Sequence, residues 1–75
     1  MKRVAEIIAD IMDIDPNTIN EKTNLLIDLQ MSSFDVVSIV SMLENEYKID
    51  ITEQDVRKVN IVDDIIKLIE EKRGQ

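Results

Sequence analysis

The chain has 75 residues, of which 16 are acidic and nine are basic, and its formal net charge is −7. It contains no cysteine and no histidine, which excludes disulfides, zinc–thiolate sites, cysteine nucleophiles and the commonest general base. The acidity disfavours nucleic acid and anionic membrane surfaces as partners. We therefore expect one small domain over residues 1–75 that is not an enzyme.

The first predicted helix begins near Val4, because apolar residues recur from there at helical spacing, at Val4, Ile7, Ile8 and Ile11. The Asp15–Pro16 pair ends the pattern, since the residue before a proline is disfavoured in the helical region. A loop of about 15 residues follows, which is long for a compact domain and therefore a candidate functional segment. Its apolar residues from Leu25 to Leu29 are expected to attach it to the core.

The second helix is predicted to begin near Ser32, which together with Asp35 three residues later resembles a capping box. It ends near Tyr47, and its apolar stripe is expected to face the core: Val36, Ile39, Val40, Leu43 and Tyr47. Phe34 lies about 160° around the helix from Val36. An exposed phenylalanine at a helix start indicates a surface to which something binds.

Two further helices are predicted in the last third of the chain. Thr52 is the expected N-cap of a short helix through Val56. Asn60 opens the expected cap of a last helix that ends before Gly74 and carries its apolar side at Val62, Ile65, Ile66 and Ile69. The predicted fold is all-α, a small four-helix bundle of three long helices and one short one, with a long loop between the first two helices.

No metal site and no membrane segment are predicted. Residues 13–17 resemble the start of a calcium loop, but Thr18 and Asn24 stand where that loop needs glycine and glutamate. No apolar run approaches the roughly 20 residues of a membrane span. Glu6 and Asp10 interrupt any signal peptide. We therefore expect a cytoplasmic protein, with an organelle after processing as the alternative.

Ser33 is the residue whose surroundings favour a function. The sequence offers no histidine and no suitably placed lysine to activate it, so a catalytic role is disfavoured, and a serine at a helix start is usually a cap or a first-turn polar residue. The stretch from Val4 to Tyr47 holds nine acids and one base, a charge of −8. Ser33 therefore lies beside the apolar Phe34 and Val37 within acidic surroundings, a pattern typical of a docking surface, with acids at Asp35, Glu44 and Glu46.

These residues resemble the acyl carrier proteins along nearly the whole chain. The family motif is close to Asp-Leu-Gly-x-Asp-Ser-Leu-Asp, and the chain reads Asp28-Leu29-Gln30-Met31-Ser32-Ser33-Phe34-Asp35. The resemblance implies that Ser33 carries a 4′-phosphopantetheine arm, which a phosphopantetheinyl transferase adds from coenzyme A. The thiol of the arm would hold acyl groups as thioesters for fatty-acid, polyketide or specialised lipid biosynthesis.

The resemblance also implies a monomer that docks onto acyl-transferring, condensing and reducing enzymes through their basic patches. The residues expected to contact these partners are Phe34, Asp35, Val37, Ser41, Glu44 and Glu46. The chain departs from the family pattern at Gln30, Ser32, Phe34 and Ser38, where the family has glycine, aspartate, leucine and an acidic residue.

Three alternatives remain open at this point. Ser32 could replace Ser33 as the attachment residue, although the aspartate two residues after Ser33 favours Ser33. The chain could carry aminoacyl or peptidyl groups in place of acyl groups. It could also be an acidic helical interaction module without a cofactor.

Overall fold

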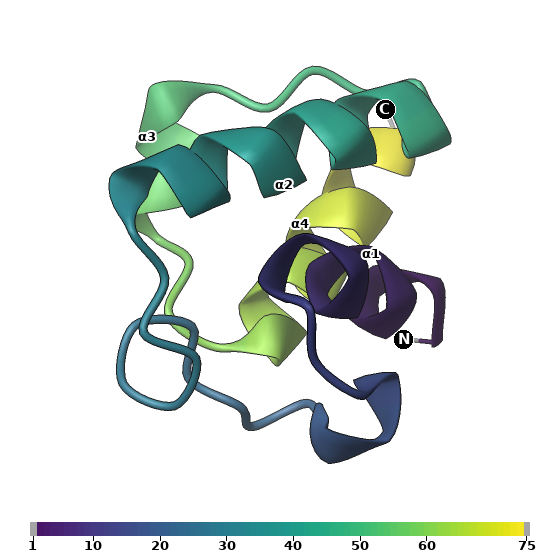
Figure 1. Ribbon diagram of the computed structural model, residues 1–75. Helices are drawn as coiled ribbons and strands as arrows, with labels where there is room; N and C mark the ends of the chain where they lie inside the picture. The colour runs from purple at the N-terminus through teal and green to yellow at the C-terminus, as the bar shows by residue number, and fades with distance from the viewer. Residues whose placement is uncertain (1, 75) are drawn as a thin grey trace.

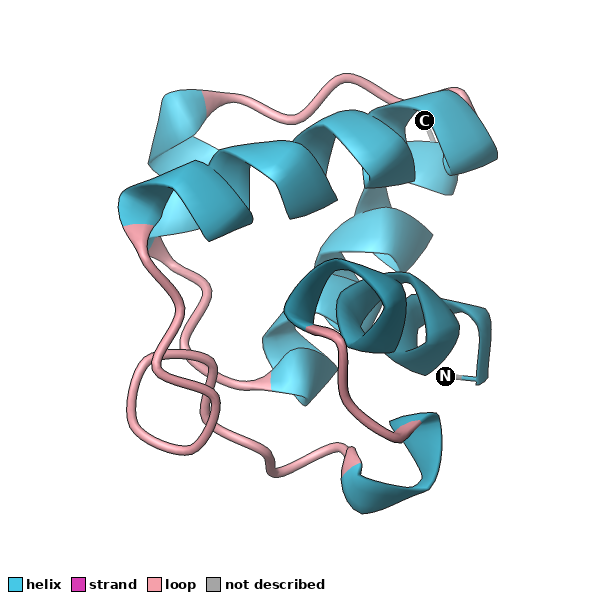
Figure 2. Ribbon diagram, in the orientation of Figure 1, coloured by secondary structure: helices cyan, strands magenta, loops and turns pink. Residues whose placement is uncertain are grey.

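The computed structural model describes residues 2–74, and within them the chain is helical. Its elements in order are α1 (Lys2–Met12), the short 3₁₀ turn η1 (Pro16–Thr18), α2 (Ser33–Tyr47), α3 (Glu53–Arg57) and α4 (Val62–Arg73). Figure 1 shows α2 crossing above α1, with the long loop descending from the start of α2. Helices and loops account for the whole described ribbon in Figure 2, which confirms the predicted all-α bundle. No helix within this described part has the length and apolarity to cross a membrane.

The core is built mainly from one apolar face of each long helix. Ile8 of α1 and Val62 of α4 are fully buried, and α1 packs directly against α2. The predicted stripe of α2 faces inward: Ile39 and Leu43 are buried, and the other three members pack against the same cluster. The helical spacing of apolar residues therefore located the core correctly.

The long loop is fastened to the start of α4 by backbone hydrogen bonds. The N–H of Leu25 donates to the carbonyl of Asn60 at 3.0 Å. In return, the N–H of Val62 donates to the carbonyl of Thr23 at 3.1 Å, and the N–H of Asp63 donates to that of Glu21 at 2.9 Å. The loop thereby satisfies N–H groups in the first turn of α4 that would otherwise lack an acceptor.

The predicted cap of α4 at Asn60 was wrong. The N-cap position is Ile61, whose side chain has no hydrogen-bonding atom, and the loop carbonyls take over the role of a capping side chain. The carboxylate of Asp64 closes the turn from the other side by accepting the N–H groups of Asn60 (2.9 Å) and Ile61 (3.1 Å). These two bonds lower the pKa of Asp64.

The predicted attachment of the loop through Leu25 to Leu29 is half right. Leu25 is buried and Leu29 packs against the core, but Leu26 and Ile27 are 61% and 76% exposed. The side chain of Asn24 accepts the N–H groups of Leu26 and Ile27, so the segment coils into a tight turn. A tight turn presents only part of its circumference to the core, and the two middle residues face outward.

Candidate functional site

The start of α2 is held by a complete capping box. The N–H of Asp35 donates to Ser32 Oγ at 3.2 Å. In the reverse direction, Asp35 Oδ2 accepts the N–H of Ser32 at 3.0 Å and its hydroxyl at 3.1 Å. The box predicted from the sequence is confirmed, with aspartate in the position where glutamate or glutamine is more usual.

The two neighbouring serines have different surroundings because of this cap. The hydroxyl of Ser32 is occupied in both directions by Asp35. Ser33 is the first residue of α2, its side chain is exposed, and its hydroxyl has no hydrogen bond among those of residues 2–74. The structure thus presents one serine that stabilises the helix and one whose oxygen is free to react.

The position of Ser33 suits an attached anion. Ser33 and Phe34 are the first two residues of a 15-residue helix, so their N–H groups lie at the end of α2 where the helix dipole is positive. A phosphodiester on Ser33 would lie at this end, where free N–H groups and the dipole favour negative charge. The residues present therefore fit a phosphate-linked arm.

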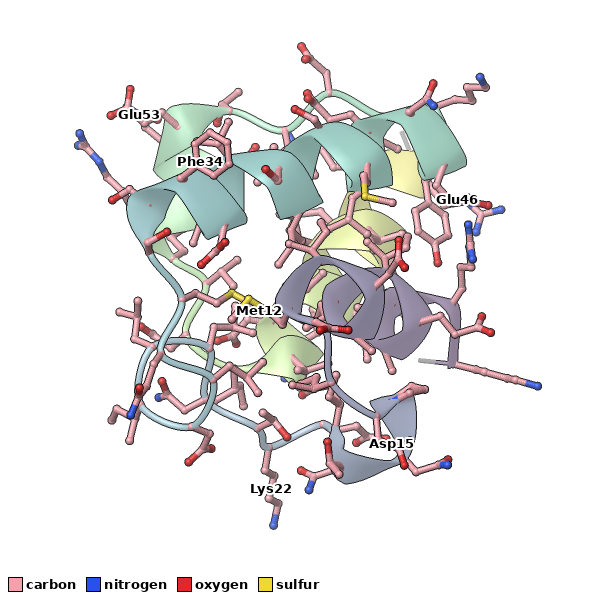
Figure 3. All side chains as sticks on the ribbon, in the orientation of Figure 1. Met12, Asp15, Lys22, Phe34, Glu46 and Glu53 are labelled. Atoms are coloured by element: carbon pink, nitrogen blue, oxygen red, sulfur yellow. The ribbon has the colours of Figure 1, made fainter. Side chains whose placement is uncertain are left out.

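The apolar residues predicted as partner contacts lie on the surface. Phe34 is 79% exposed and Val37 is 62% exposed, and Ser41, one turn further along α2, is exposed as well. Figure 3 shows the ring of Phe34 on the outer side of α2. These three residues share one side of the helix, since positions three, four and seven apart face the same way.

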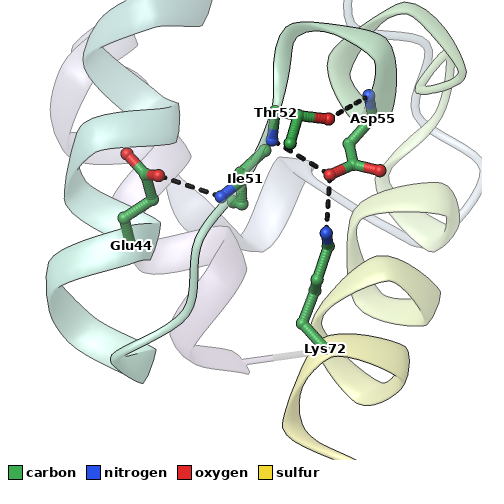
Figure 4. A network of polar contacts seen from close by, with 5 residues as sticks. All are labelled: Glu44, Ile51, Thr52, Asp55 and Lys72. Atoms are coloured by element: carbon green, nitrogen blue, oxygen red, sulfur yellow. Dashed lines mark hydrogen bonds and ion pairs between the residues drawn. The ribbon is translucent and has the colours of Figure 1, made fainter. Parts of the chain in front are cut away.

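The three acids predicted as partner contacts are already engaged within the chain. Asp35 is part of the cap. Glu44 is half-buried and accepts the N–H of Ile51 at 2.9 Å, which ties α2 to the segment before α3 (Figure 4). Glu46 accepts Arg3 Nη2 of α1 at 2.8 Å, and this bond raises the pKa of Arg3. All three carboxylates therefore have a structural role.

Sequence reasoning missed an exposed apolar turn that leads into this site. Leu26 and Ile27 project from the turn described above, and the N–H of Met31 donates to the carbonyl of Leu25 at 3.2 Å, which brings the turn back to the residue before Ser32. The sequence signal for this turn was the pair Asn24 and Asp28, four residues apart, on either side of Leu26 and Ile27. Asp28 Oδ2 accepts the N–H of Asn24 at 2.7 Å, as the carboxylate of a capped turn does.

An apolar cavity of about 30 Å³ lies behind α2. Its walls come from α2, α3, α4 and the connections around them, and they consist of aliphatic side chains and methionine, including Val36, Val40, Val56, Val59 and Leu68. The volume exceeds the roughly 10–15 Å³ that a cavity needs to hold one water-sized group. The lining offers nothing polar for a water to bind, so the cavity suits a methylene or methyl group.

Comparisons with known proteins agree with this geometry. The family profile described as "Phosphopantetheine attachment site" matches residues 2–69. The acyl carrier protein of Picosynechococcus sp. is 32% identical over 72 residues, which cover 96% of this chain and 89% of the relative. The chain belongs to the acyl carrier protein family.

Other carriers of this family show the same likeness. The acyl carrier protein of Solidesulfovibrio magneticus is 30% identical over 99% of this chain and 95% of its own length. Among solved structures, the acyl carrier protein from Enterococcus faecalis superposes with a TM-score of 0.79 at 28% identity, covering 95% of this chain and 90% of its own. That from Thermotoga maritima gives 0.80 at 26% identity, over 96% and 84%.

Family membership fixes the general role of the chain. It is an acyl carrier and not an enzyme, and its cofactor is 4′-phosphopantetheine. The thiol of that group supplies the thioester bond, which a chain without cysteine cannot form by itself. The carrier role implies contact with the enzymes that attach the cofactor and with those that use the bound acyl group.

Proposed function

We propose that Ser33 is the attachment residue and that the chain carries acyl thioesters between the enzymes of a biosynthetic pathway. The observation that supports this choice is the contrast between the two serines: the hydroxyl of Ser32 is committed to Asp35, whereas that of Ser33 is exposed and free. Modifying Ser32 would break the cap, while modifying Ser33 leaves every bond of the cap intact.

This chain exposes Ser33 to the transferase and stabilises the phosphodiester that forms on its hydroxyl oxygen. A phosphopantetheinyl transferase joins Ser33 Oγ to the phosphate of the pantetheine arm, adenosine 3′,5′-bisphosphate leaves coenzyme A, and the hydroxyl proton is lost. The start of α2 then favours the new negative charge.

The pathway partners are acyl-transferring, condensing and reducing enzymes of fatty-acid or related lipid or polyketide biosynthesis. Basic patches on these enzymes would meet the acidic half of the chain, where Asp10, Asp13 and Glu21 are exposed. The apolar cavity behind α2 supports an acyl cargo over an aminoacyl one, since a charged amino group would find no acceptor there. We further propose that residues 1–75 act as one monomeric domain in the cytoplasm, the compartment that also supplies the coenzyme A from which the arm is transferred.

Mass spectrometry tests the attachment residue. Incubation with coenzyme A and a broad-specificity phosphopantetheinyl transferase should add one phosphopantetheine to the wild-type chain. Ser33→Ala should gain nothing, whereas Ser32→Ala, the matched control one residue away, should still be modified. No gain by the wild-type chain with several transferases would contradict the proposal.

Loading assays test the cargo. Acyl-activating and aminoacyl-activating enzymes should be compared on the holo-protein, with thioester formation followed by mass spectrometry. Loading by acyl but not aminoacyl enzymes is expected, and the reverse preference would overturn the acyl assignment.

A further inference from the structure

The apolar cavity behind α2 is too small for more than the tip of an acyl chain. Its volume of about 30 Å³ leaves room for about two water-sized groups. Met31 and Val36, which flank Ser33 in the sequence, line the cavity together with Val56 of α3 and Val59 just after it. Packed side chains cannot simply be compressed, so a longer cargo enters only if one of the walls moves.

The wall that α3 provides is the one that moves at the lowest cost. This helix has five residues, none of which is buried, and a helix of that length is not stable alone. Each longer helix buries apolar side chains in the shared core, such as Ile8, Ile39 and Ile65. Moving a longer helix would expose this buried surface, whereas moving α3 exposes mainly the partly buried Val56 and Val59.

One ion pair connects α3 to another helix. Lys72 Nζ of α4 lies 2.8 Å from Asp55 Oδ2, and each of the two side chains is about a fifth exposed (Figure 4). Among the described residues, 2–74, this is the one hydrogen bond or ion pair that joins the segment 52–59 to another part of the fold. The other polar contacts of the segment are internal to it.

The chain on both sides of this segment is fixed separately. Before it, the N–H of Ile51 donates to Glu44 of α2 at 2.9 Å. After it, the carbonyl of Asn60 accepts the N–H of Leu25 at 3.0 Å. The segment is therefore anchored at both ends, and Lys72 holds its middle in place beside the cavity.

We propose that Lys72 limits the length of the acyl group that this carrier can enclose. The tip of a short acyl group enters the cavity with the Lys72–Asp55 ion pair intact, whereas a longer chain has to displace α3 and break the pair. Breaking it costs free energy, because a carboxylate and an ammonium group that are largely shielded from water lose each other as partners. Lys72 is a positioning residue, since it contacts α3 and is not part of the cavity wall. This inference rests on the proposed carrier function and adds which cargo the chain favours.

Hydrogen exchange tests the hold of Lys72 on α3 in the unmodified chain. NMR gives the exchange rate of the Val56 amide, which is hydrogen-bonded within its own segment, relative to the amides of α2. Lys72→Met should raise this relative rate by about tenfold, the effect of losing one hydrogen bond to a charged group. Lys72→Arg, which keeps the charge, should raise it less. Lys67→Met is the matched control and should stay within about twofold, because Lys67 pairs with Asp63 of its own helix.

Loading the chain with butyryl and dodecanoyl groups tests the effect on cargo. A phosphopantetheinyl transferase and the two acyl-coenzyme A thioesters give the two loaded forms, and circular dichroism gives their melting temperatures. The difference between the dodecanoyl and butyryl forms of one variant cancels any general loss of stability. This difference should be small in the wild-type chain and in Lys67→Met, because breaking the ion pair offsets the burial of the longer chain. In Lys72→Met it should be larger by about 5 °C.

Two results would overturn the inference. One is an unchanged relative exchange rate of Val56 in Lys72→Met, and the other is an equal difference between the dodecanoyl and butyryl forms in all variants. Either could occur while Ser33 is modified normally, so failure of the inference is distinct from failure of the proposed function. Failure of Ser33 to be modified would overturn both, and mass spectrometry detects it before any melting experiment.

Discussion

Helices α2 and α3 begin with the same local motif and use it differently. Ser32 and Asp35 cap α2, and Thr52 and Asp55 cap α3 with nearly equal hydrogen-bond lengths. Asp55 also accepts Lys72 of α4 at 2.8 Å, with both side chains about a fifth exposed (Figure 4). Asp35 has no such cation within 4 Å among the described residues.

The difference shows that one capping motif can either link its helix to another helix or stabilise only its own first turn. At α3 the carboxylate links a five-residue helix to α4. Such a short helix needs tertiary contacts of this kind because it is not stable alone. At α2, a helix of 15 residues, the cap holds only its own turn and leaves Ser33 unobstructed. The bond from Lys72, aided by Thr52, lowers the pKa of Asp55 to about 2.

Removing the two cap carboxylates should give unequal losses of stability. Asp55→Ala should lower the melting temperature more than Asp35→Ala, because it breaks the link to α4 as well as the cap. Thermal unfolding followed by circular dichroism measures both variants. Equal losses would mean that Lys72 adds nothing and that the two caps are equivalent.

Acid should weaken the α3 cap because it protonates the carboxylate of Asp55. The pKa of Asp55 in the folded protein, about 2, lies below its ordinary value of 3.8. Its contribution is therefore present at neutral pH and is lost as the pH falls from about 4 to 2. Urea unfolding at several pH values should show this loss of stability, and Lys72→Met should reduce it. Lys67→Met is the matched control, because its ion pair with Asp63 involves a largely exposed lysine and its charge is the smallest of the causes that lower the pKa of Asp64. It should reduce the acid dependence less than Lys72→Met does.

Removing the hydroxyl caps should give smaller and nearly equal losses. Ser32→Ala and Thr52→Ala should each cost about 1 kcal/mol of unfolding free energy, the usual value for an N-cap side chain. Urea denaturation measures the two losses. If the Ser32→Ala loss were near zero, the hydroxyl of Ser32 would not be held by the cap, and the contrast with Ser33 would disappear.

The smallest effect is expected from the left-handed residues that precede the two caps. Gln30 has φ 53° before α2, and Lys48 has φ 56° at the end of α2 before the connection to α3. Glycine relieves about 1 kcal/mol of strain in this region but loses part of that through greater freedom in the unfolded chain. Gln30→Gly and Lys48→Gly should each raise the melting temperature slightly, while Gln30→Ala should not. A lower melting temperature for Gln30→Gly would contradict the expectation.

The sequence alone was sufficient for the main helices and the core side of α2, and it predicts Ser33 as the attachment residue. Apolar spacing located the core side of α2, and the spacing of Ser32 and Asp35 located its first turn. Such signals are local: each depends on residues three or four apart, and a helix brings those residues together whatever the rest of the chain does. The motif around Ser33 is local in the same sense.

Tertiary structure decided everything that depends on residues far apart in the chain. The cap of α4 comes from carbonyls of the loop about 40 residues earlier, so Asn60 was the wrong residue. Glu44 and Glu46 are predicted partner contacts, and nothing in the sequence indicates that the fold also brings Ile51 and Arg3 to them. Leu26 and Ile27 were expected to pack into the core but are exposed, because Leu25 and Leu29 occupy the side of the turn that faces the core. Composition and local pattern determine which residues can make contacts, but only the packed chain determines which contacts are made.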